Sequence, residues 1–226
     1  MDSRHQALHG VLQTIENAAK LAGRPAGVKL LAVSKTRPAA DVRALAGAGQ
    51  RAFGENYVQE GVAKARELAD LGLEWHLIGH LQSNKAREAA AAFDWVQSLD
   101  RPKLVKALDQ ARPAGRPPLN VLVQVNIDDE ASKSGCAPAE VPALAAAVAA
   151  APNLALRGLM AIPAPAPDEA ARRASFRRLK QLYDQLAAAH PGVDTLSMGM
   201  SDDYPLAIAE GATLVRIGTA LFGPRG

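Results

Sequence analysis

Short apolar runs alternate with longer amphipathic segments along most of this sequence. The apolar runs are rich in Val, Ile and Leu and have the length of buried strands, whereas the longer segments repeat their apolar positions at helical spacing. Apolar runs of this kind, bounded by turn residues, predict eight strands. The predicted strands span residues 28–34, 51–54, 73–79, 94–98, 119–127, 154–160, 194–199 and 213–218.

Helices are expected between these strands. The segments with helical spacing span residues 39–46, 57–69, 85–92, 102–111, 139–150 and 168–189, and a further helix up to about Leu21 precedes the first strand. Gly47 and Gly192 provide stop signals. Repeated β-then-α units predict an α/β protein with a single (β/α)8 TIM barrel and an extra N-terminal helix. A doubly wound open sheet is the competing architecture, although it would usually contain fewer strands.

The overall composition is that of an ordinary soluble globular protein. Of the 226 residues, 48% are hydrophobic and 22% are charged, and the net charge is +3. We expect a single domain over residues 1–226. The sequence contains no run of about 18 apolar residues, and its N-terminal segment lacks the apolar core of a signal peptide. These features predict a cytoplasmic protein without a membrane segment.

Cysteine, histidine and arginine patterns narrow the classes of function. The single cysteine, Cys136, excludes an intrachain disulfide and a multi-cysteine metal site. His76 and His80 would straddle the end of a strand, which argues against a shared metal ion. The basic segment over residues 172–180 interleaves apolar residues at helical spacing. It is therefore interpreted as the solvated face of a helix, and no nucleic-acid partner is expected.

The site of a barrel of this class forms where its strands end. Lys35 follows the first predicted strand in the segment LLAVSKTRP, and a lysine is rarely placed there unless its amine is used or its stem reaches water. The loops after the seventh and eighth strands usually hold phosphate in this fold, and here they contain Ser201, Gly218 and Thr219. Read alone, these small residues could also be ordinary turn and cap residues.

An amine facing a phosphate-binding loop suits a phosphorylated aldehyde. Desolvation lowers the pKa of a lysine, so its amine can attack a carbonyl group. Pyridoxal 5′-phosphate has both an aldehyde and a phosphate, and it is the cofactor predicted here. A Schiff-base aldolase acting on a phosphorylated sugar would use the same pair of features, so it stays an alternative.

Seven segments of the sequence, which occur in the same order as in the family, closely resemble the YggS/PROSC family of pyridoxal phosphate homeostasis proteins. They are LLAVSKTRP, FGENYVQE, WHLIGHLQSNK, NVLVQVNIDDEASKSG, LRGLMAIPAP, LSMGMSDD and VRIGTALFG, and they span residues 30–223. The resemblance implies a barrel similar to the N-terminal domain of alanine racemases, with pyridoxal 5′-phosphate held as an aldimine on Lys35. Pro205, just after LSMGMSDD, departs from the family's pattern, although proline is tolerated in the first turn of a helix.

The resemblance also implies roles for other residues of the site. Ser201, Gly218 and Thr219 match the positions that hold the phosphate, and Arg216 matches the arginine that faces the pyridine nitrogen. The residues implied to line the remainder of the pocket are Asn56, Met160 and Ser197. A permanently charged guanidinium beside the pyridine nitrogen opposes its protonation, which makes the ring a weaker electron sink.

The predicted function is a carrier of pyridoxal 5′-phosphate without significant turnover. Racemisation needs a second base on the opposite face of the substrate, which racemases of related fold take from an additional β domain and a partner subunit. This chain ends at Gly226, shortly after the last motif. We therefore expect a monomer that acts in intracellular pyridoxal phosphate homeostasis, with pyridoxal phosphate-dependent apoenzymes as candidate recipients. The alternative is an enzyme, either an amino-acid racemase using the same cofactor or a Schiff-base aldolase.

Two further lysines are candidates for a secondary cofactor site. Lys133 follows the fifth strand and is interpreted as a solvated loop lysine, with Ser132 and Ser134 shaping a turn. Lys85 lies at a polar helix start, which favours pairing with a phosphate or carboxylate over covalent chemistry. The sequence leaves both cases open.

Overall fold

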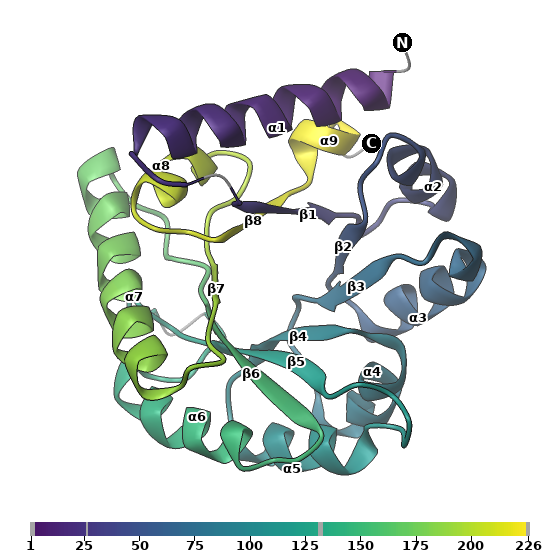
Figure 1. Ribbon diagram of the computed structural model, residues 1–226, viewed down its shortest axis with the longest axis vertical. Helices are drawn as coiled ribbons and strands as arrows, with labels where there is room; N and C mark the ends of the chain where they lie inside the picture. The colour runs from purple at the N-terminus through teal and green to yellow at the C-terminus, as the bar shows by residue number, and fades with distance from the viewer. Residues whose placement is uncertain (1–2, 26, 131–132, 225–226) are drawn as a thin grey trace.

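Eight parallel strands close into a barrel in the computed structural model, which describes residues 3–25, 27–130 and 133–224 (Figure 1). Each strand pairs with its sequence neighbour, and β8 pairs with β1, where Leu31 lies opposite Arg216. The strands are β1 Lys29–Val33, β2 Ala52–Glu55, β3 Glu74–Leu77, β4 Trp95–Leu99, β5 Leu119–Gln124, β6 Leu154–Met160, β7 Thr195–Ser197 and β8 Leu214–Ile217. This closure confirms the predicted (β/α)8 TIM barrel and excludes the open sheet.

Helices surround the barrel. In the described part of the chain they are α1 Ser3–Leu21, α2 Ala39–Gly47, α3 Val58–Glu67, α4 Ala86–Ala92, α5 Pro102–Ala111, α6 Val141–Ala149, α7 Glu169–Ala189, α8 Tyr204–Ala209 and α9 Thr219–Phe222. Short 3₁₀ helices at Ala69–Leu71, Ser83–Lys85 and Pro138–Glu140 lie at the ends of some predicted helices. The 3₁₀ helix is a tighter form that is common where an α-helix begins or ends. No described helix combines the length and the apolar character needed to cross a membrane.

The N-terminal helix α1 completes the outer ring of helices beside β8 and β1 (Figure 1). The helix after β8, α9, has only four residues. Helix α1 covers the part of the barrel that this short helix leaves open, and it packs against α8, α9 and α2. It does so through Leu8, Val11, Ile15 and Ala19, which are buried and spaced three or four residues apart. The extra helix predicted ahead of the first strand therefore has a structural role in the barrel.

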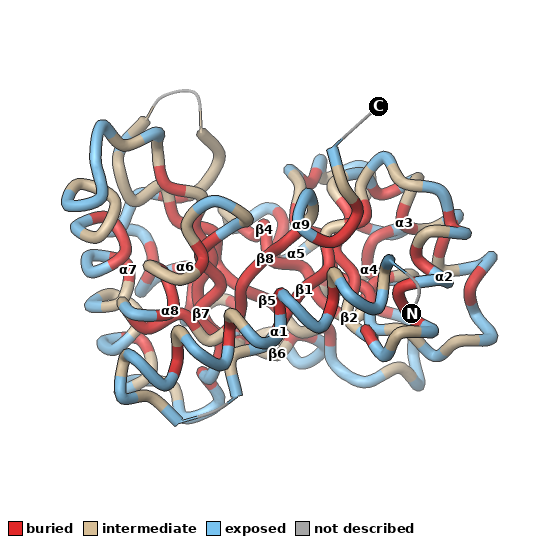
Figure 2. Tube along the Cα trace, turned by 90° about the horizontal axis from the view of Figure 1, so that it is seen from above, coloured by how far each residue is buried: buried red, intermediate tan, exposed pale blue. Residues whose placement is uncertain are grey.

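Burial is concentrated in the strands and in the inner faces of the helices (Figure 2). Strands β4 and β8 are buried along their whole length, as expected for parallel strands covered on both faces. The interior of such a barrel is usually filled by branched apolar side chains. Here several buried side chains on the strands are polar or charged instead, namely His76, Gln97, Ser197 and Arg216, which are joined by hydrogen bonds across the interior. The interior of this barrel is therefore partly polar.

Some predicted strands extend beyond the observed ones. The strand predicted over residues 73–79 ends at Leu77, and the one over residues 119–127 ends at Gln124. After Leu77 the chain makes a close backbone contact, since a Cβ on Gly79 would lie 2.1 Å from the carbonyl oxygen of Asn56. These segments lie in the loops at the carboxyl ends of the strands.

The basic segment over residues 172–180 lies on α7. Phe176 and Leu179 on this segment are fully buried. Arg173 and Arg177 form ion pairs with Glu210, at the end of α8, with N–O distances of 2.9 and 2.8 Å. The segment therefore forms an amphipathic helix whose arginines tie α7 to α8, in agreement with the interpretation from sequence.

Candidate functional site

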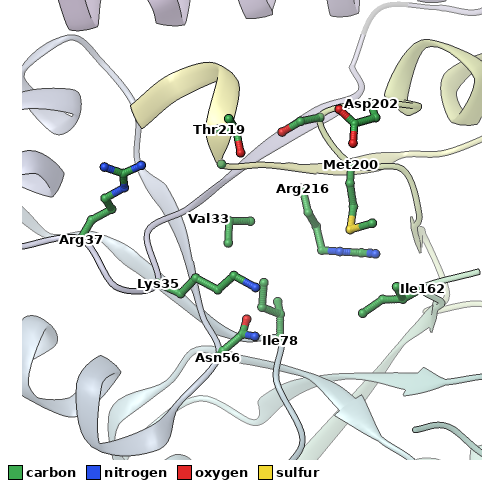
Figure 3. Close-up of a pocket in the computed structure, with 12 residues that line it drawn as sticks. Val33, Lys35, Arg37, Asn56, Ile78, Ile162, Met200, Asp202, Arg216 and Thr219 are labelled. Carbon is green, nitrogen blue, oxygen red and sulfur yellow. The ribbon is translucent and has the colours of Figure 1, made fainter. Parts of the chain in front are cut away.

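A cavity of about 270 Å³ lies at the carboxyl ends of the strands (Figure 3). Its walls come from β8, the end of β1 and the loops after β1, β2, β3, β6, β7 and β8. The lining residues are Val33, Lys35, Arg37, Asn56, Ile78, Ile162, Met200, Ser201, Asp202, Arg216, Gly218 and Thr219. The barrel thus brings segments from both ends of the sequence to one site.

Lys35 extends into this cavity beside Asn56 and Ile78 (Figure 3). It lies just after β1 and is preceded by the fully buried Ser34 and followed by Thr36. Thr36 has a φ of 63°, in the left-handed region that a β-branched residue rarely adopts. The backbone therefore turns sharply at the residue after the lysine, and neighbouring contacts must hold this turn in place.

A cluster of three charged side chains, the buried Glu55 and Lys64 and the partly exposed Glu60, holds both peptide groups that flank the cavity lysine. On one side, Ser34 Oγ donates to Glu55 Oε1 at 2.6 Å, and Lys64 Nζ donates to the Ser34 carbonyl at 2.7 Å. On the other side, the Thr36 N–H donates to Glu60 Oε1 at 2.6 Å. Lys64 Nζ also contacts both carboxylates at 2.8 Å. Burial raises the pKa of Glu55, and the hydrogen bonds from Lys64 and Ser34 oppose that rise.

Small and hydroxyl residues form the wall opposite Lys35. Ser201, Gly218 and Thr219 line the cavity, and Figure 3 shows Thr219 across from Lys35. A Cβ on Gly218 would lie 3.2 Å from the Val33 carbonyl oxygen, so a larger residue would crowd β1. Hydroxyl groups on a closely approaching backbone suit the oxygens of an anion such as a phosphate group.

The loop that carries Ser201 is held in one conformation by its neighbours. Gly199 has a φ of 92°, and a Cβ there would lie 2.5 Å from a side chain of α8, so only glycine fits. Asp203 Oδ1 accepts a hydrogen bond from the Met200 N–H at 2.8 Å, and Asp203 pairs with Arg172 at 3.3 Å. Contacts to α7 and α8 therefore position this wall of the cavity.

Arg216 carries a buried positive charge at the cavity wall (Figure 3). Its Nη1 donates to Ser197 Oγ at 2.6 Å, and its Nη2 donates to the Ala161 carbonyl at 2.9 Å. Burial lowers the pKa of Arg216 to about 10, and nearby Asp203 opposes that change. The guanidinium therefore remains charged at neutral pH while its orientation is set by two neutral acceptors.

The structure groups most of the residues singled out from the sequence. Those that line the cavity are Lys35, Asn56, Ser201, Arg216, Gly218 and Thr219. Met160 and Ser197 are not among the lining residues, because both side chains are fully buried. Met160 packs with Ile162, which does line the cavity, and Ser197 contacts Arg216. Their roles toward a cofactor stay predictions.

Sequence reasoning missed the apolar part of the wall. Ile78, Ile162 and Met200 line the cavity, and none was singled out as a site residue. Ile78 follows β3 and Ile162 follows β6, so the position just after a strand was the available signal. Arg37 and Asp202 also line the cavity and were likewise missed.

The remaining candidates lie elsewhere. Lys85 pairs with Glu88 at 3.1 Å, and neither Lys85 nor Lys133 lines the cavity. Ser132, expected beside Lys133 in a turn, lies outside the described residues. Burial raises the pKa of the Cys136 thiol to about 12, so it stays protonated. The described residues contain no cluster of His, Cys, Asp or Glu able to hold a metal ion, around His80 or elsewhere.

Comparison with known proteins agrees with this architecture. The family described as alanine racemase, N-terminal domain, matches residues 10–226. The pyridoxal phosphate homeostasis protein of Pseudomonas aeruginosa is 61% identical over 216 residues, which cover 95% of this chain and 93% of the relative.

Solved structures agree as well. PipY of Synechococcus elongatus with pyridoxal phosphate bound is 41% identical, with a TM-score of 0.78, and the match covers 93% of this chain and 100% of PipY. A protein of Bifidobacterium adolescentis is 36% identical, with a TM-score of 0.89 and coverage of 98% of this chain and 97% of that protein. A closed parallel barrel with a lysine after its first strand thus places this protein in the class of alanine racemase N-terminal domains. Within that class, the chain belongs to the family of pyridoxal phosphate homeostasis proteins.

Proposed function

We propose that this protein binds pyridoxal 5′-phosphate through Lys35 and acts in pyridoxal phosphate homeostasis without significant catalytic turnover. The observation that carries this proposal is the shared cavity, because the Lys35 amine and the hydroxyl residues Ser201 and Thr219 line the same space. The cofactor bound to PipY and the name of the Pseudomonas aeruginosa relative support the same conclusion.

The residues of the cavity fit the parts of this cofactor. When bound, pyridoxal 5′-phosphate supplies an aldehyde that condenses with an amine and a pyridine ring that can act as an electron sink. Lys35 provides the amine, and the hydroxyls of Ser201 and Thr219, together with the backbone at Gly218, would bind the phosphate. Arg216 would face the ring nitrogen and oppose its protonation. Ile78 and Ile162 give the ring apolar neighbours.

The same lining favours a carrier over a racemase. A racemase needs acid–base groups on both faces of its substrate. Asp202 is the one carboxylate among the described residues that line the cavity, and Figure 3 shows it on the side of the cavity where Thr219 lies, away from Lys35. A base on that wall is poorly positioned for a substrate whose reacting carbon would lie next to the Lys35 amine.

Borohydride reduction tests the proposal directly. After incubation with pyridoxal 5′-phosphate, reduction and digestion, mass spectrometry is expected to locate the pyridoxyl group on the peptide that contains Lys35. Lys35→Ala should lose the modification, whereas Lys85→Ala should keep it, because Lys85 is outside the cavity. A wild-type protein without an adduct, or with its main adduct on another lysine, would contradict the proposal.

Exchange with deuterated solvent separates a carrier from a racemase. The loaded protein should leave the α-protons of amino acids unexchanged when these are followed by nuclear magnetic resonance. Exchange at the rate of an enzymatic turnover, lost in Lys35→Ala, would favour the racemase instead.

The proposal includes the setting in which the protein works. We propose a single barrel domain that is monomeric and cytoplasmic and that delivers its cofactor to pyridoxal phosphate-dependent apoenzymes. The ordinary composition and the modest net charge of +3 support a freely diffusing carrier without a nucleic-acid partner. Light scattering at several protein concentrations measures the oligomeric state.

A further inference from the structure

A continuous series of polar side chains crosses the interior of the barrel from the cavity to its opposite end. Arg216 Nη1 contacts Ser197 Oγ at 2.6 Å, and Ser197 Oγ contacts Gln97 Oε1 at 2.7 Å. Gln97 Nε2 contacts His76 Nδ1 at 2.9 Å, and His76 Nε2 contacts Glu74 Oε1 at 2.8 Å. The members come from β8, β7, β4 and β3. We call this series the Arg216–Glu74 relay.

Both ends of the relay require the same hydrogen-bond direction. Arg216 has only donors, so Ser197 Oγ accepts from it and donates its own hydrogen to Gln97 Oε1. Gln97 therefore presents its amide N–H to His76, whose Nδ1 accepts. At the other end Glu74 has only acceptors, so His76 Nε2 carries the hydrogen and donates it. A neutral imidazole protonated at Nε2 meets both requirements, and every bond then runs from the cation toward the carboxylate.

The middle of the relay is closed to water. Ser197 and Gln97 are 0% exposed and His76 is 1% exposed, whereas 47% of the Glu74 side chain is exposed. The His76 ring stacks on Trp95 with its centroid 5.1 Å away and an interplanar angle of 7°. In such surroundings a polar atom without a partner costs about 1–3 kcal/mol. Removing one member therefore disturbs its neighbours on both sides.

We propose that Gln97 and His76 are positioning residues, which hold the Arg216 guanidinium at the cavity wall and link its orientation to Glu74 at the far end of the barrel. The inference rests on the proposed function, because Arg216 matters there as the group that faces the ring nitrogen of the cofactor. Two acceptors set the guanidinium plane, namely Ser197 Oγ and the Ala161 carbonyl. The backbone fixes the second acceptor, whereas the relay fixes the first.

The charges around His76 are consistent with a neutral ring. Burial lowers the pKa of His76. The carboxylates of Glu74 and Asp94 oppose this, and Lys29 acts in the same direction as burial. The hydrogen bond from His76 lowers the pKa of Glu74, so the acceptor at the end of the relay is ionised at neutral pH. A second proton on Nδ1 would face the amide N–H of Gln97, which is also a donor.

Nitrogen-15 spectra of the cofactor-free protein test the direction of the relay. We expect His76 to show the neutral tautomer with its hydrogen on Nε2 throughout the range from about pH 5 to about pH 8, where an ordinary histidine titrates. A tautomer with the hydrogen on Nδ1, or a titration near the ordinary histidine pKa, would overturn the proposal.

Gln97→Met tests the positioning of Arg216. It removes both relay contacts at similar volume, so the nitrogen-15 signals of the Arg216 guanidinium should shift in the cofactor-free protein. Binding of pyridoxal 5′-phosphate should weaken about tenfold, corresponding to one lost hydrogen bond. The matched control is Gln50→Met, because Gln50 is also buried but donates only to the Leu30 and Ala52 carbonyls. Unchanged Arg216 signals in Gln97→Met, or the same shift in Gln50→Met, would overturn the proposal.

Gln97→Glu tests whether the contacts matter rather than the amide itself. One oxygen of the new carboxylate can accept from Ser197, while the other can accept from a doubly protonated His76. We therefore expect His76 to become cationic while the Arg216 signals and the affinity for pyridoxal 5′-phosphate stay near those of the wild type. A Gln97→Glu protein with the defects expected of Gln97→Met would count against the proposal. If Gln97→Met does not fold, the Gln97→Glu variant and the tautomer of His76 in the wild-type protein decide whether the proposal holds.

The spectra of the cofactor-free protein keep this inference separate from the proposed function. A missing adduct on Lys35 would refute the proposed function whatever the state of His76. Conversely, a labelled Lys35 together with a relay of the wrong tautomer would refute the positioning role alone.

Discussion

Lys64 is the side chain on which the conformation around Lys35 most depends. It is 6% exposed, and its ammonium group contacts the fully buried carboxylate of Glu55 and the Ser34 carbonyl. Lys64→Met would leave Glu55 buried without its cation, and we expect the free energy of unfolding to fall by about 3–5 kcal/mol in urea titrations. The double variant Lys64→Met with Glu55→Gln should recover part of this loss, because no buried charge remains.

The pH dependence of Lys64→Met follows from the sign of the Glu55 shift. Burial already raises the pKa of Glu55 in the folded protein, and losing Lys64 removes the main opposing effect. A group with a raised folded pKa contributes stability that is present below its unfolded pKa and is lost as the pH rises through the folded value. Lys64→Met should therefore lose stability, relative to the wild type, as the pH rises above about 4.

Lys180→Met is the control for this experiment. Lys180 pairs with Asp184 on the surface of α7, where such pairs contribute little, and its replacement should change stability by about 0.5 kcal/mol or less. Equal losses in Lys64→Met and Lys180→Met would show that the cluster around Glu55 does not hold the Lys35 loop.

At the scale of elements, α1 should be required for the stability of the barrel. Ile15 on its inner face is 5% exposed, whereas Leu12 on its outer face is 44% exposed. Ile15→Ala should lower the free energy of unfolding by about 2–5 kcal/mol, because it leaves a cavity against the barrel. Leu12→Ala should change it by about 0.5 kcal/mol. Similar effects of the two substitutions in chemical denaturation would mean that α1 is not packed as described.

The elements themselves were largely predictable from the chain. The spacing of Leu8, Val11, Ile15 and Ala19 in α1 and the apolar residues on either side of Arg216 in β8 are local patterns, so they could be read without knowing the fold. Element ends were less predictable. Just after β3, Gly79 leaves no room for a side chain because the Asn56 carbonyl, in a different loop, lies against it, and such a contact cannot be read from the local pattern.

At the scale of the whole molecule, ion pairs between elements should make the free energy of unfolding depend on pH in the acidic range. Burial acts to raise the pKa of Asp194, but hydrogen bonds from Arg157 and Thr195 outweigh it and the pKa is lowered. The pKa of Glu210 is likewise lowered, because Arg177 and Arg173 outweigh its burial. A lowered folded pKa gives stability that is present above the unfolded value and lost as the pH falls.

We therefore expect the free energy of unfolding to decrease as the pH falls from about 5 to about 2. Asp194→Asn should reduce this dependence by about 1 kcal/mol or less, because its pair with Arg157 is partly exposed. Glu16→Gln, on the exposed face of α1, serves as the control. An acid dependence in Asp194→Asn identical to that of the wild type would contradict this assignment.

The candidate site was predictable where it followed from strand order. Lys35 comes after the first apolar run and Gly218 after the last, and a barrel brings all strand ends to one rim, so their meeting could be expected. Met160 and Ser197 also come from strand ends, but their side chains are buried and do not line the cavity. Both side chains lie behind the lining residues, since Ser197 bonds Arg216 and Met160 packs with Ile162, and a one-dimensional pattern does not show which layer of the interior a residue occupies.

The sequence by itself determined the succession of strands and helices, the position of the lysine and the likeness to a known family, because these depend on local periodicity and on residue identity. Only the tertiary structure decided that β8 pairs with β1, that Lys64 lies beneath the Lys35 loop, and that Ser197 meets Gln97 across the barrel. The physical reason is distance along the chain. Ser197 and Gln97 are 100 residues apart, and their hydrogen bond exists only because strand tilt and closure bring β7 and β4 to face each other across one interior.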